Sequence, residues 1–141
     1  MKLTVLAVGK LKDAWVREGC EEYARRLRGK LPCELIETKH DDELLKRLPE
    51  RHRVWALDER GKELSSNELA QALKRHMDAG EQGIAFVVGG ADGLPAPLLQ
   101  RADFRWSLGR LTLPHRLARL ILFEQLYRAL SIVRGEPYHR P

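Results

Sequence analysis

A chain of 141 residues, of which 43% are hydrophobic and 32% are charged, predicts one soluble globular domain with a substantial core. Aromatic residues make up only 6%, which disfavours a binder of single strands through an aromatic platform, and no apolar run is long enough to span a bilayer. The whole net charge of +5 lies in residues 101–141, where eight arginines stand against three acidic residues, whereas residues 1–100 are neutral in sum.

The N-terminal part of the sequence alternates apolar runs with amphipathic ones. Residues 3–8 form a short apolar run, which indicates a buried strand more than a signal peptide. Asp13 can cap a following helix that ends at Gly29, and the core face of that helix has helical spacing: Trp15, Val16, Cys20, Tyr23, Ala24 and Leu27. Residues 33–38 predict a second strand, and residues 41–48 predict a short helix that stops near a proline.

The middle of the sequence repeats this alternation. Residues 53–57 predict a third strand, which a polar loop at 58–62 follows. Ser65 and Glu68 form a capping box for the next helix, and Gly80 closes it.

The remaining elements begin with an uninterrupted apolar run at residues 83–88, typical of a strand buried on both faces of a parallel sheet. Three glycines follow it within residues 89–93. We expect a short helix at 97–101, a strand at 104–108 and a long helix from 114 to about 134. The whole pattern predicts an α/β fold with a mostly parallel sheet and helices on both faces, in a single domain over residues 1–141.

The last predicted helix is apolar in nearly every direction. Only Glu124, Arg128 and Ser131 form a polar stripe, and the first two are spaced for an i,i+4 ion pair. Such a helix needs cover on two sides, so we expect the sheet on one side and the second subunit of a homodimer on the other. Burial at the centre of a monomer is the alternative.

The two cysteines, Cys20 and Cys33, have no metal-binding spacing and no partner motif. They indicate free thiols in a reducing compartment, so we expect a cytoplasmic protein with no metal and no membrane contact.

Candidate site residues gather where loops leave the carboxyl ends of the predicted strands, because open α/β sheets bind ligands there. The loops are those after Leu57, at residues 89–93 and at residues 108–114. Glycines let backbone approach a ligand closely, although a tight turn is the commoner role of Gly-Gly. No GxGxxG follows a strand and no GxxxxGK[ST] occurs, which disfavours dinucleotide binding and P-loop hydrolysis.

His115, at the start of the last helix, is a candidate general base or phosphate contact, with a structural histidine as the alternative. Tyr138, His139 and Arg140 lie on a terminal tail. Tails are usually disordered, yet these three residue types suit a nucleobase and a phosphate. The basic segment as a whole fits a polyanionic partner, and a solvated arginine-rich helix is the alternative.

An ordered series of motifs gives the sequence a family resemblance over essentially its whole length. The motifs are LDERGK at 57–62, SS at 65–66, FVVGGADGL at 86–94, WSL at 106–108, LTLPH at 111–115, EQLYRA at 124–129 and PYH at 137–139. With these motifs the chain resembles the RlmH family of ribosomal RNA large-subunit methyltransferases, a minimal branch of the SPOUT class.

The resemblance implies a C-terminal trefoil knot, a homodimer, S-adenosylmethionine as the methyl donor, and N3-methylpseudouridine in 23S rRNA of assembled ribosomes as the product. The cofactor pocket it implies consists of Leu57, Gly89, Gly90, Gly109, Arg110, Leu111, Thr112, Leu113 and Pro114. The catalytic residues it implies, which would meet the RNA base, are His115, Tyr138, His139 and Arg140.

A mechanism follows from the chemistry of the base, because the N3 proton of pseudouridine must leave before nitrogen attacks a methyl sulfonium. His115 or His139 is the preferred base, and Tyr138 would orient the ring, but the sequence leaves the base open among these three candidates. Phosphates would be held by Arg140, Arg128 and Arg134, with help from Arg116 or Arg119. Two rival functions stay open, a non-catalytic ribosome-binding factor and a small-molecule nucleotide-binding regulator.

Overall fold

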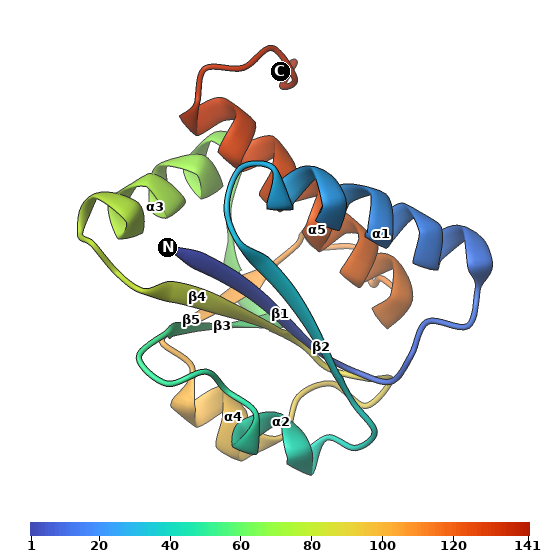
Figure 1. The fold of residues 1–141 in the computed structure, drawn as a ribbon. Coiled ribbons are helices and arrows are strands. Elements are labelled where there is room, and N and C mark those ends of the chain that lie inside the picture. Colours follow the sequence, from blue (N-terminus) through green and yellow to red (C-terminus); the bar gives the residue numbers. More distant parts are fainter.

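One parallel sheet between two layers of helices forms the molecule, which a computed structural model describes over residues 1–141 (Figure 1). The strands pair in the order β2-β1-β4-β3-β5, and every pair is parallel. Their bounds are β1 (Lys2–Val8), β2 (Cys33–Thr38), β3 (Arg53–Glu63), β4 (Gly83–Val88) and β5 (Phe104–Ser107). The predicted parallel α/β fold is confirmed.

The helices divide between the two faces of the sheet (Figure 1). The larger core packs one face against α1 (Ala14–Arg28), α3 (Ser66–Asp78) and α5 (His115–Val133). A smaller cluster packs the other face against α2 (Asp42–Lys46) and α4 (Ala96–Arg101). β4, the central strand, is buried at all six positions, as its apolar composition predicts.

The capping box of α3 is confirmed in detail. The Ser65 hydroxyl accepts a hydrogen bond from the backbone N–H of Glu68 at 3.1 Å, and the Glu68 carboxylate accepts one from the N–H of Ser65 at 2.8 Å. These bonds to Ser65 hold the pKa of Glu68 below its usual value.

Asp13 does occupy the N-cap position of α1, but the predicted cap is wrong because its side chain makes no capping hydrogen bond. The carboxylate instead pairs with Arg116 at 3.1 Å. The carboxylate therefore pairs with a charged side chain on α5 and not with the backbone N–H groups of α1. No local sequence pattern could indicate this long-range contact.

The predicted loop at residues 58–62 is also wrong, because β3 continues to Glu63. Trp106 of β5 pairs with both Leu57 and Lys62, so residues 58–61 bulge out of the ladder between two paired stretches. A Cβ on Gly61 would lie 2.5 Å from the backbone carbonyl of Arg105, so this close approach of β3 to β5 requires glycine.

The expectation that Trp15 packs in the core fails as well. Its surface is 61% exposed, whereas Trp55 and Trp106 are buried, with only 4% and 3% of their surface exposed. The buried stripe of α1 runs through Val16 and Cys20 and leaves Trp15 to one side.

α5 lies between α1 and α3 on the sheet, and its predicted ion pair forms, with Arg128 2.7 Å from Glu124. Its inner side is fully buried, and Leu117, Leu120 and Ile121 on the rest of the helix stay half-buried in this single chain. A second subunit over α5 therefore stays a prediction. None of the helices combines the length and the apolar character that crossing a membrane would need.

Candidate functional site

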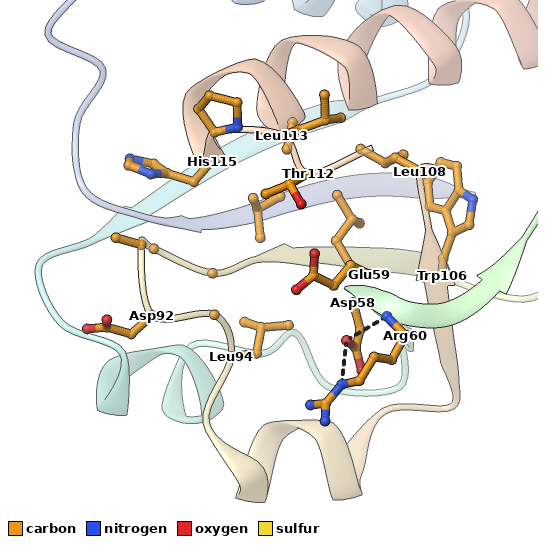
Figure 2. A pocket seen from close by; sticks show the side chains of 18 of the residues that line it. Asp58, Glu59, Arg60, Asp92, Leu94, Trp106, Leu108, Thr112, Leu113 and His115 are labelled. Atoms are coloured by element: carbon orange, nitrogen blue, oxygen red, sulfur yellow. Dashed lines mark hydrogen bonds and ion pairs between the residues drawn. The ribbon is translucent and has the colours of Figure 1, made fainter. Parts of the chain in front are cut away.

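A cavity of about 720 Å³ opens at the carboxyl ends of β3, β4 and β5 (Figure 2). Three segments line it: the end of β3 with its bulge, the loop after β4, and the loop between β5 and α5. The volume falls within the range of sites for small molecules and cofactors. This is the edge at which the sequence places its candidate ligand loops.

The loop after β4 folds back tightly on itself. Gly93 donates a backbone hydrogen bond to the carbonyl of Gly90 at 3.0 Å and has a φ of +78°, which favours glycine. A Cβ on Gly89 would lie 2.5 Å from the backbone carbonyl of Gly93, whereas one on Gly90 would only reach ordinary contact with Val8 at 3.7 Å. Gly89 is therefore required for the turn itself, whereas Gly90, which also lines the cavity, has room for a Cβ.

The loop between β5 and α5 forms the opposite wall. The Ser107 hydroxyl accepts a hydrogen bond from the N–H of Gly109 at 3.2 Å and donates one to its carbonyl at 2.9 Å, and Gly109 adopts a φ of +142°. Residues 111–114 then lead along the cavity into α5. Arg110 is the one predicted cofactor residue that does not line it.

Two acidic side chains from the bulge of β3, Asp58 and Glu59, line the cavity (Figure 2). The sequence did not single them out as site residues. Asp58 accepts a hydrogen bond from the backbone N–H of Arg60 at 3.1 Å and pairs with its side chain at 3.8 Å. Glu59 and Asp92 have no ion-pair partner, so they favour a ligand that carries positive charge or hydroxyl groups. The position of Asp58 and Glu59 directly after the strand predicted at residues 53–57 was the signal that could have identified them as site residues. No group of three or more histidine, cysteine or acidic side chains has an arrangement that could hold a metal ion.

His115 is the first residue of α5, and its exposed imidazole lies at the cavity (Figure 2). Pro114 precedes it, and no side chain caps this end of the helix. The ring is therefore available to a molecule that enters the cavity beside the loop at 108–114.

Arg119, one turn further along α5, is 1% exposed, so the expectation that it helps to hold phosphate is wrong. Its guanidinium donates to Glu37 of β2 at 2.6 Å and to the carbonyls of Val8 and Gly9 at 3.1 and 2.9 Å. Its Nε has no partner. The side chain therefore ties the beginning of α5 to the carboxyl ends of β1 and β2.

The other residues expected to meet RNA lie at the far end of α5. Tyr138, His139 and Arg140 follow the C-terminus of α5, a helix about 28 Å long whose opposite end carries His115, and none of them lines the cavity of its own chain. The structure thus brings together His115 and the loops predicted to bind the cofactor, and separates them from the tail.

The tail is docked against α1 and α5 of its own chain. The Tyr138 hydroxyl donates to Glu124 at 2.9 Å and lies 3.3 Å from the hydroxyl of Tyr23, and its ring packs edge-on against Tyr127. Burial, followed by the hydrogen bonds to Tyr23 and Glu124, raises the pKa of Tyr138 well above its usual value. A neutral, donating Tyr138 is unsuited to act as a base here.

His139 is held by Arg128, whose guanidinium lies 3.2 Å from its Nδ1. Because a guanidinium can only donate, Nδ1 accepts in this arrangement and the ring proton is on Nε2. Arg128 also donates hydrogen bonds to the carboxylate of Glu124, and these bonds raise the pKa of Arg128.

The arginines expected to hold phosphate are thus occupied to different degrees. Arg128 and Arg134 pair with Glu124 and Glu136, and Arg116 pairs with Asp13. Arg105, Arg110 and Arg140 are the arginines of residues 101–141 that are exposed and make no ion pair, and Arg105 donates a hydrogen bond to the carbonyl of Leu99 at 3.2 Å.

Comparison with known proteins gives concordant results. Residues 1–139 match the model of a family described as predicted SPOUT methyltransferases. Ribosomal RNA large subunit methyltransferase H of Rubrobacter xylanophilus is 45% identical, with 98% of each chain covered. The protein of that name from Sorangium cellulosum is also 45% identical, over 98% of this chain and 99% of its own.

A solved structure, that of a probable methylase family protein from Haemophilus influenzae, is similar with a TM-score of 0.57 at 12% identity. The match covers 99% of this chain and 70% of the other. At this identity the likeness concerns the fold alone.

Proposed function

This chain belongs to the SPOUT methyltransferase family, in its ribosomal RNA large subunit methyltransferase H branch, and from that premise we propose a specific reaction. The protein transfers a methyl group from S-adenosylmethionine to N3 of a pseudouridine in 23S rRNA, on assembled ribosomes. The similar proteins are named as large-subunit rRNA methyltransferases. The methyl donor, the methylated atom and the assembled ribosome as substrate are our proposals.

The cavity at the carboxyl edge of the sheet is the observation that carries this proposal. Its volume of about 720 Å³ suits a nucleoside-sized cofactor, and two of its walls expose backbone that side chains do not cover. The unpaired carboxylates of Glu59 and Asp92 suit a ligand with a sulfonium, an ammonium and ribose hydroxyls. The residues that would hold it are Leu57, Gly89, Gly90, Gly109, Leu111, Thr112, Leu113 and Pro114.

S-adenosylmethionine bound there supplies an electrophilic methyl group on a positively charged sulfur. The remaining work falls to side chains that position the base and take its N3 proton. We assign proton removal to His115, because its exposed ring is the one titratable base of the three candidates that lies at the cavity. His139 of a second subunit is the alternative.

A homodimer would place the tail of one subunit at the cavity of the other. Because Tyr138, His139 and Arg140 lie at the opposite end of α5 from the cavity, they reach a reacting base only if another subunit presents them. We propose that two chains pair through α5 in this way. Mixing a His115→Ala chain with an Arg140→Ala chain should then give more activity than the two variants show separately, whereas no gain would contradict the shared site.

The C-terminal trefoil knot is likewise a proposal. The chain leaves β5 at the edge of the sheet, passes the loop after β4 at the shared cavity, and only then enters α5 on the face covered by α1 and α3. This path supports a segment threaded past the loops after β3 and β4.

The test is the transfer of a labelled methyl group from S-adenosylmethionine to ribosomes that lack the modification, with free 23S rRNA in parallel. We expect label in the large-subunit RNA of the assembled particle. Cofactor binding without label would contradict the proposed substrate. Ribosome binding without cofactor binding would favour the non-catalytic ribosome-binding factor instead.

A further inference from the structure

Trp15 is the one tryptophan of the three that the fold does not bury, with 61% of its surface exposed. It belongs to the stripe of α1 that faces α5. One turn further along that stripe, a Cβ on Gly19 would lie 3.0 Å from Leu120, and after another turn the ring of Tyr23 lies 6.0 Å from that of Tyr127. Trp15 therefore continues the line of contacts toward the beginning of α5.

The beginning of α5 leaves the indole uncovered. The ion pair between Asp13 and Arg116 places the start of α1 beside the first turn of α5, next to His115. α5 starts at His115, so no further turn of this helix is present to pack on Trp15. In this single chain the indole therefore lies near the beginning of α5 and is mostly exposed.

The segments at the beginning of α1 and before α5 carry exposed apolar side chains and an excess of basic residues. Leu111, on the loop that leads into His115, is 80% exposed, and it and Trp15 are the two most exposed large apolar side chains of the molecule. The segments that carry them, residues 10–18 and 110–116, contain five basic residues against two acidic ones: Lys10, Lys12, Arg17, Arg110 and Arg116 against Asp13 and Glu18.

We propose that Trp15 stacks on an unpaired nucleobase of the RNA beside the target nucleotide, while Lys10, Lys12 and Arg110 contact its phosphates. Single-stranded RNA is recognised by aromatic stacking together with cationic contacts to the backbone. This inference rests on the proposed function, for which it names the RNA-holding surface.

A second copy of the chain is the competing occupant of an exposed apolar surface. A two-fold contact centred on Trp15 would place the same patch on itself and so oppose like charges. The excess of basic residues therefore favours a polyanion at Trp15 over a two-fold contact centred on this residue.

The test uses Trp15→Ala and Trp15→Phe in the full-length protein, with Leu45→Ala as the matched control, since Leu45 is an exposed apolar residue on α2 at the opposite face of the sheet. For methyl transfer to undermethylated ribosomes, we expect Trp15→Ala to raise KM about tenfold, and Trp15→Phe to restore most of the loss. Affinity for S-adenosylmethionine should not change, and Leu45→Ala should match the parent.

Salt dependence separates stacking from charge. Trp15→Ala should weaken binding of a short oligouridylate at every salt concentration and leave the slope of log K against log salt unchanged. Lys12→Ala should lower that slope. Acrylamide quenching should also report on Trp15 alone, because the other two tryptophans are buried, and oligouridylate should protect it.

The outcomes are distinguishable from those of the proposed function. An unchanged KM for Trp15→Ala on an active enzyme would overturn the stacking surface and keep the methyltransferase. Trp15-dependent binding of oligouridylate without methyl transfer would do the reverse. A shift of Trp15→Ala from dimer to monomer in sedimentation would overturn the RNA contact and make Trp15 a subunit contact.

Discussion

The two ends of α5 are built in opposite ways. At its C-terminal end, aromatic packing, an ion pair and a hydrogen-bonded tyrosine hold the tail against α5 and α1. At its N-terminal end, His115 and the loop before it are exposed, and no side chain caps the helix. Below that open end, the buried guanidinium of Arg119 makes three hydrogen bonds.

This difference between the two ends of α5 indicates which end is accessible to ligands and which end must rearrange before it can bind another molecule. The open end keeps backbone groups and an imidazole free for ligands, and its position is fixed from beneath by a residue that ligands cannot reach. The closed end satisfies its polar groups internally, so a tail that is to serve another subunit must first leave these contacts.

The largest effect should come from removing the buried support. We expect Arg119→Met to lower the free energy of unfolding by about 3–5 kcal/mol, because Glu37 and two backbone carbonyls lose their donor. Arg116→Met is the matched control, since its ion pair with Asp13 is about half exposed and such pairs contribute at most about 1 kcal/mol. Chemical denaturation measures both, and equal losses would contradict a special role for Arg119.

His115 tests whether the open end does the chemistry. His115→Ala should lower turnover about 10²-fold and leave the dissociation constant for S-adenosylmethionine nearly unchanged. Tyr138→Phe, at the closed end, should keep most of the turnover because Tyr138 is a hydrogen-bond donor here and not a base. A larger loss for Tyr138→Phe than for His115→Ala would reverse the assignment of the two ends.

A pair of glycines tests the wall of the cavity. Gly89→Ala should weaken cofactor binding about tenfold and lower the melting temperature, since the new Cβ meets the backbone of Gly93 and the turn must shift. Gly90→Ala should leave the melting temperature unchanged because its Cβ finds only ordinary contacts. Calorimetric titration would then show whether the cofactor itself lies against Gly90, and an unaltered turn in Gly89→Ala would contradict the first prediction.

The closed end should open at high pH. The pKa of Tyr138 is raised in the docked tail, so docking is at full strength below the ordinary tyrosine pKa of about 10 and is lost as pH rises through the higher value of the docked state. NMR of isotope-labelled tyrosine should show the release, and Tyr138→Phe should abolish this pH dependence. Release at neutral pH would contradict the contacts to Tyr23 and Glu124.

The smallest effect concerns a single free cation. Arg140→Ala should weaken ribosome binding and reduce the salt slope by about one, because one phosphate contact is lost. Arg134→Ala is the control, since Arg134 is paired with Glu136. Equal slopes for Arg140→Ala and the parent protein would remove Arg140 from the phosphate contacts.

Several features were predictable because their causes are local in the sequence. The capping box of Ser65 and Glu68, the strand at residues 83–88 and the glycine loop after it all follow from periodicity and from the residue types that turns require. The carboxyl edge of a parallel sheet then places the loops after Leu57, after β4 and before His115 at one cavity.

Only the tertiary structure decided the rest, because it depends on which faces meet. The sequence presents Arg119 and Arg140 as equal positive charges, but the packing of α5 buries the first between strand ends and leaves the second in solvent. The same spacing predicts that Trp15 and Val16 are both in the core, and the point at which α5 begins leaves Trp15 exposed. The sequence by itself determined most of the elements and the loops that line the cavity, and the packing of distant surfaces determined which side chains remain exposed there.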